Sequence, residues 1–163
     1  MAHSRIFMIS QSPIDPDDYI SEDVCYPEGG DWSFVGNIAD YVDEETDREE
    51  DIQWLKEVLT NAMKDKVEFN DEEKSFVFKT GFREEYFKDK KEAFLEVVEK
   101  MKSGEPDWGF ETQLFASAAL GYINDKWSFY FYDNGFFHQI DSFIRNTGAN
   151  VKFYIGNTID YHY

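Results

Sequence analysis

The fold is decided by residues 47–78, which read DREEDIQWLKEVLTNAMKDKVEFNDEEKSFVF. Apolar residues first recur at the spacing of one helix face, and these are Ile52, Leu55, Leu59 and Ala62. This period predicts a helix over about 47–63. Apolar residues then alternate over 67–69 and again over 76–78, with a polar stretch between them. Alternation on both sides of a short polar loop predicts a β-hairpin.

The rest of the chain, outside residues 47–78, contains both helix and strand patterns. A second helix is predicted over 83–102, and strands are predicted over 6–9 and 151–155. The run 127–132 is aromatic at every position but one, which is typical of a central strand covered on both faces. These elements predict a single α+β domain over residues 1–163, with a central mixed or antiparallel sheet of about five strands and several packed helices.

Three segments carry conflicting or weaker patterns. Residues 34–42 have helical spacing, and a short helix is expected there. Residues 110–123 fit both a helix and an alternating strand, and we favour the helix. Asn134 and Gly135 form a strong hairpin signal, but the apolar residues of 136–144 recur at helical spacing. We expect the longer helical pattern to prevail.

The charge is concentrated in one segment. The chain has 163 residues and a net charge of −18, and residues 15–51 hold fifteen carboxylates against a single base, Arg48. This segment therefore carries −14 of the total. Its second half spans the expected start of helix 47–63, where Thr46 and Glu49 have the spacing of a capping box. Carboxylates stabilise a helix N-terminus, so this half has a structural explanation.

The first half of the segment lies in an irregular acidic loop, residues 10–32, and has no such explanation. Proline and glycine punctuate the loop. A loop of this length without regular structure is usually functional or disordered, so a partner-binding loop and a mobile solvated loop both fit. The candidate partner-binding residues are its acidic and aromatic side chains: Asp15, Asp17, Asp18, Tyr19, Glu22, Asp23, Tyr26, Glu28 and Asp31.

The composition argues against several classes of partner. Nucleic acids and anionic membranes attract basic surfaces, and this chain is strongly acidic without a cluster of Lys and Arg. We therefore expect no direct nucleic-acid binding and no membrane binding. Cys25 is the single cysteine, so no intrachain disulfide forms, and a cytoplasmic location is expected. Cys25 also has no basic neighbour in sequence that would make its thiol reactive.

No sequence motif indicates catalysis or a metal. The chain lacks a Gly-rich phosphate loop, a G-x-S-x-G elbow and an H-E-x-x-H motif. The acidic clusters lack the glycine that an EF-hand requires. His138 and Asp141 would share a helix face, but a structural zinc site needs four ligands. Glu72 and Lys74 form an E-x-K pattern at a predicted turn, where a solvated surface explains them. The catalytic residues stay unknown, and the sequence predicts no metal site and no cofactor and favours a protein that is not an enzyme.

The function that these observations favour is a protein-binding module with an anionic face directed at a basic protein partner. In composition alone, the chain is similar to small acidic bacterial proteins that act as immunity, antitoxin or anti-restriction factors, although it matches none of their motifs. Two alternatives stay open. One is a small-molecule-binding protein or enzyme with an aromatic-lined pocket and carboxylates. The other is a structural domain whose acidic surface serves solubility.

Overall fold

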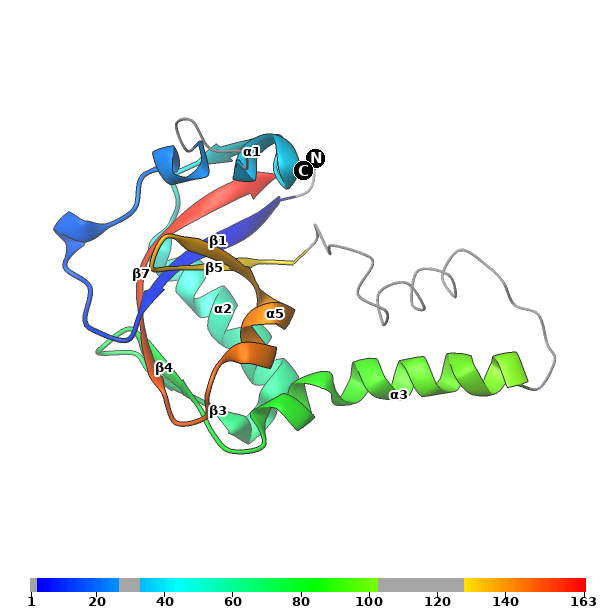
Figure 1. Cartoon of the computed structure of the whole chain (residues 1–163). Coiled ribbons are helices and arrows are strands. Elements are labelled where there is room, and N and C mark those ends of the chain that lie inside the picture. The colour runs from blue at the N-terminus through cyan, green and yellow to red at the C-terminus, as the bar shows by residue number, and fades with distance from the viewer. Residues whose placement is uncertain (1–2, 27–32, 103–127) are drawn as a thin grey trace.

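The computed structural model describes residues 3–26, 33–102 and 128–163 (Figure 1). The strands are β1 (His3–Ser10), β2 (Tyr41–Asp43), β3 (Val67–Asn70), β4 (Ser75–Phe78), β5 (Tyr130–Asp133), β6 (Phe136–Gln139) and β7 (Lys152–His162). The α-helices are α1 (Phe34–Asn37), α2 (Arg48–Met63), α3 (Phe82–Lys102) and α5 (Ile140–Asn146). Single 3-10 turns are η1 (Pro16–Asp18), η2 (Glu22–Cys25) and η3 (Lys64–Lys66). Within these ranges, none of the helices has the length and apolar character that crossing a membrane requires.

The predicted helices over 47–63 and 83–102, the hairpin between them and the strands at 6–9 and 151–155 are confirmed. The segment 110–123 lies outside the described residues, so its helix prediction is not addressed by the structure.

The described strands form one mixed sheet of seven strands, two more than expected. Their order is β3-β4-β7-β1-β5-β6, and β2 also pairs with β7. β1 and β5 are parallel, whereas all other pairs are antiparallel. β7 organises the sheet, because β1 pairs along one side of it while β4 and β2 pair with its two ends on the other side. Figure 1 shows β7 running the length of the sheet beside β1.

Both faces of the sheet are covered. The core beneath α2, α3 and α5 is rich in buried aromatic rings, including Phe7, Phe76, Phe78, Phe131 and Phe153. The opposite face packs against α1 and η2 through residues that include Ile6, Cys25, Phe34, Ile159 and Tyr161. Neighbouring residues of a strand point to opposite faces, which is why Tyr130 and Phe131 of β5 lie in different cores. The prediction of a central, doubly covered aromatic strand is thus confirmed for β5; Trp127 itself lies outside the described residues.

The helix expected over 34–42 is wrong beyond its first turn. Gly36 has φ +91°, which is outside the helical range and favours glycine, and α1 ends at Asn37. Residues 41–43 then form β2 and pair with the last three residues of β7. Backbone pairing with the sheet therefore overrides the helical spacing of the apolar residues.

The helix expected over 136–144 is wrong in its first half. Asn134 and Gly135 have φ of 49° and 87°, as a two-residue hairpin turn requires. β6 pairs with β5 through this turn, and α5 begins only at Ile140. The turn signal of Asn134 and Gly135 prevailed over the helical spacing because β6 forms backbone hydrogen bonds with β5.

Candidate functional site

The described part of the acidic loop presents five exposed carboxylates: Asp15, Asp17, Asp18, Glu22 and Asp23. Within the described residues, no Lys or Arg forms an ion pair with any of them. Tyr19 is half-buried, and Tyr26 is 45% exposed. Glu28 and Asp31 lie outside the described residues. The structure therefore places seven of the nine candidate residues in one loop at the surface.

The middle of this loop is fastened to the edge of β7 that lies between β4 and β2. The Ile20 N–H donates to Asn157 Oδ1 at 3.1 Å, and Asn157 Nδ2 donates to the Ile20 carbonyl at 2.6 Å. The Arg48 guanidinium lies 5.6 Å from the centre of the Tyr19 ring and donates to the Gly156 carbonyl at 2.5 Å. These contacts anchor the loop to the sheet, while its carboxylates stay in solvent.

The second half of the acidic segment caps α2, as expected, but through a different residue. Asp47 Oδ1 accepts the backbone N–H groups of Glu49 and Glu50, both at 3.1 Å. The capping box expected from Thr46 is wrong, because Thr46 Oγ1 lies 2.6 Å from Thr158 Oγ1 instead. Three further carboxylates, on β2 and the turn after it, are exposed: Asp43, Glu44 and Glu45.

About half of the described carboxylates beyond position 51 are paired with a neighbouring Lys or Arg. Eight described acidic residues beyond position 51 pair with Lys or Arg: Asp65, Glu68, Asp71, Glu73, Glu85, Glu99, Asp141 and Asp160. The hydrogen bond from Lys152 lowers the pKa of Glu73, and the bond from Lys79 lowers the pKa of Glu68 in the same way. The unpaired charge is therefore concentrated at the acidic segment.

The two halves of the segment meet in space. The backbone N–H of Glu22 donates to Glu44 Oε2 at 3.0 Å, which joins η2 to the turn after β2. We use the name acidic surface for the exposed carboxylates of both halves that lack a described Lys or Arg partner. These are Asp15, Asp17, Asp18, Glu22, Asp23, Asp40, Asp43, Glu44, Glu45, Asp47 and Glu50. The structural half and the candidate half of the segment are therefore in contact at Glu22 and Glu44.

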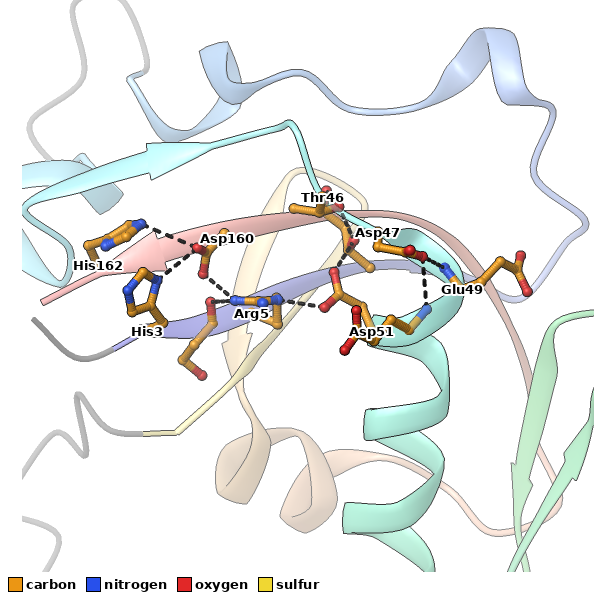
Figure 2. Close-up of polar contacts among 11 residues, drawn as sticks. His3, Arg5, Thr46, Asp47, Glu49, Asp51, Asp160 and His162 are labelled. Atoms are coloured by element: carbon orange, nitrogen blue, oxygen red, sulfur yellow. Dashed lines mark hydrogen bonds and ion pairs between the residues drawn. The ribbon is translucent and has the colours of Figure 1, made fainter.

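A second polar cluster, which the sequence did not predict, lies where β1 begins and β7 ends (Figure 2). His3 pairs directly with His162, and Arg5 pairs with Asp160. Cross-strand partners share a face, as do alternate residues of one strand, so all four side chains lie together. His3 Nδ1 and His162 Nε2 lie 3.0 and 3.2 Å from the same atom, Asp160 Oδ2. Tyr41 of β2 stacks on the His162 ring with centroids 3.8 Å apart.

Arg5 connects this cluster to the start of α2. Its Nη1 donates to Asp160 Oδ1, and its Nε donates to Asp51 Oδ1 at 2.6 Å. Asp51 Oδ2 also accepts the Thr158 hydroxyl at 2.7 Å, and Asp51 is buried. Figure 2 shows Arg5 between the two carboxylates. Burying a carboxylate is costly unless it is paired and hydrogen-bonded, and Asp51 has both kinds of partner.

The other sequence candidates have structural partners. His138 lies on β6 rather than on a helix with Asp141, and Asp141 accepts hydrogen bonds from Tyr86 at 2.8 Å and Lys90 at 2.7 Å. Lys74, from the E-x-K pattern, pairs with Glu49 at 2.5 Å. The ion pairs of Lys74 and Asp141 connect separate elements of the fold. This structural role accounts for both residues without a functional site.

Cys25 is fully buried in the core beneath η2. Burial, with a smaller contribution from the negative charge of Glu22, raises the pKa of its thiol from 9.0 to about 12. Only the thiolate is strongly nucleophilic, so burial and the raised pKa predict that this thiol reacts slowly in the folded chain.

We expect Cys25 to resist the thiol reagent DTNB at pH 8 in the native protein and to react fully in denaturant. The release of thionitrobenzoate, followed by absorbance, measures one thiol per chain in the unfolded state. The Cys25→Ser variant is the control and should release none in either state. Rapid stoichiometric labelling of the native protein would contradict the buried position of Cys25.

Comparison of the chain with protein-family models, curated proteins and solved structures gives no match.

Proposed function

We propose that this protein is a binding module whose acidic surface docks a basic protein partner. The observation that carries the proposal is the contrast in charge pairing. Eight of the fifteen described acidic residues beyond position 51 have a Lys or Arg partner, whereas the eleven carboxylates of the acidic surface have none within the described residues. A field of unpaired charges of one sign attracts an oppositely charged partner and speeds its association.

Two further features support a protein partner. The loop is anchored through Ile20 and Tyr19, so its carboxylates are held on a defined framework, which reduces the ordering cost of binding. Tyr26 is 45% exposed beside these charges. Tyrosine offers a large apolar ring with a polar end and is enriched in protein interfaces. Charge would then set the rate of encounter, while the aromatic ring would supply contact area.

The test uses the full chain as bait to isolate the partner from the native host, followed by association kinetics with the purified pair. We expect the quadruple variant Asp17→Asn, Asp18→Asn, Glu22→Gln and Asp23→Asn to reduce the association rate constant at low salt by about tenfold or more. Tyr26→Ala should instead raise the dissociation rate constant, because it removes contact area.

A matched control removes the same charge elsewhere. Glu57→Gln, Glu72→Gln, Glu84→Gln and Glu92→Gln change four exposed carboxylates that lie outside the acidic surface. This control should retain the wild-type rate constant. Equal loss in the two quadruple variants, or binding that is equally strong at low and high salt, would contradict a docking role for the acidic surface.

A further inference from the structure

We infer that His3, Asp160 and His162 form a binding site for one Zn²⁺ ion. Each side chain offers one ligand atom, and the three atoms lie within 4.8 Å of one another. Imidazole nitrogen and carboxylate oxygen are both normal zinc ligands, and two His with one acid form a known type of three-ligand set. This inference does not depend on whether the acidic surface binds a partner.

The separations fit a tetrahedral ion. Zinc bonds of about 2.0 to 2.2 Å place neighbouring ligand atoms roughly 3.3 Å apart. Asp160 Oδ2 lies 3.0 Å from His3 Nδ1 and 3.2 Å from His162 Nε2. The two imidazole nitrogens lie within 4.8 Å of each other, and zinc binding would bring them closer through a rotation of His3, whose side chain is 51% exposed.

The carboxylate is already oriented for this role. Arg5 occupies Asp160 Oδ1, which leaves Oδ2 to face both imidazoles. Arg5 is itself held by the buried Asp51. Ligating carboxylates in metal sites are commonly held by such an outer hydrogen bond, which fixes the ligand before the ion arrives.

The site has a buried floor and an open side. The side chains of His162 and Asp160 are 8% and 15% exposed, and Tyr41 covers the His162 ring. His162 Nδ1 is buried and has no hydrogen-bond partner among the described residues. The exposed side at His3 admits the ion and leaves room for water as the fourth ligand, as in open three-ligand zinc sites.

The pairing of β1 with β7 holds the three proposed ligands close together before an ion binds. The two histidines are cross-strand partners, and Asp160 precedes His162 by one alternation of β7. Asp43 of β2 is the partner of Asp160 on the other side, so a further carboxylate lies beside the site. Asp43, Asp51 and Asp160 outnumber the single charge of Arg5, which favours a cation there. A bound ion would tie the start of β1 to the end of β7.

The test is calorimetric titration of the full chain with zinc chloride in an excess of magnesium chloride, which occupies exposed carboxylates. Magnesium prefers oxygen ligands, so it competes poorly at a site with two imidazoles. We expect one Zn²⁺ per chain for the wild type and for His138→Gln, the matched control on β6. His3→Gln should weaken binding at least tenfold while leaving the fold intact, because this side chain is half exposed.

A second readout keeps the inference testable if a variant fails to fold. Zinc added to the wild-type protein should shift the ring proton resonances of His3 and His162 and leave those of His138 unchanged. Absence of stoichiometric binding in magnesium, equal losses in His3→Gln and His138→Gln, or zinc-induced shifts confined to residues of the acidic surface would each overturn the site.

Discussion

Replacement of Phe131 by Ala should lower the free energy of unfolding by about 3 to 5 kcal/mol, the largest effect expected from a single substitution in this protein. Phe131 is fully buried in β5 at the centre of the aromatic core. Its ring contacts those of Phe76 and Phe143 at centroid distances of 5.7 and 4.7 Å. Removing the ring loses its transfer free energy and leaves a cavity that the strands on both sides of β5 cannot collapse.

The measurement is chemical denaturation followed by circular dichroism, with the melting temperature as a second observable. Phe136→Ala is the matched control, because Phe136 lies on the same hairpin but is 67% exposed. Surface substitutions of this kind change stability by about 0.5 kcal/mol or less. Similar losses for the two variants would show that the ring of Phe131 does not occupy the centre of the core.

Asp51→Ala should cost about 3 kcal/mol, although it removes a negative charge from a strongly acidic chain. Asp51 accepts hydrogen bonds from Arg5 and Thr158 and lies in the first turn of α2. Truncation leaves the partly buried Arg5 with one carboxylate fewer and leaves the buried Thr158 hydroxyl without this acceptor. A buried group that loses its partner retains its desolvation cost, which is why this loss exceeds that of a surface ion pair.

Glu50→Ala is the control for Asp51→Ala. Glu50 occupies the same helical turn, carries the same charge and is exposed. Its loss should cost less than about 1 kcal/mol, the usual limit for a carboxylate near a helix N-terminus. Equilibrium denaturation at two salt concentrations separates the two effects, because a surface charge is screened more than a buried pair. A stabilised Asp51→Ala protein would mean that repulsion within the acidic segment outweighs the buried network.

Local patterns predicted the parts of the fold that depend on local chemistry. The periodicity of 47–63 and of 83–102 predicted both long helices, because a helix buries one face at a fixed spacing. The alternation around 70–74 predicted the β3–β4 hairpin for a similar reason. The predictions failed where helical spacing competed with a turn signal or with pairing to a distant strand. At 134–139 the turn prevailed over helical spacing, and at 41–43 pairing with β7 did so.

Among the candidate functional residues, some could also be located from local sequence and others could not. Composition alone located the acidic segment, because charge is read directly from the sequence. The His3–Asp160–His162 cluster left only a faint trace, two pairs of polar residues in alternation at opposite ends of the chain. Their meeting depends on the register between β1 and β7, which are separated by more than a hundred residues. A shift of one residue would turn one strand's pair to the other face of the sheet.

The sequence by itself therefore determined the class of fold, the main helices, the first hairpin and the location of the excess negative charge. Only the tertiary structure decided that the two halves of the acidic segment meet at Glu22 and Glu44 and that two histidines converge on one carboxylate oxygen. The physical reason is that periodicity and charge are properties of neighbouring residues. Strand order and register are set instead by which apolar faces can be buried together across the whole chain.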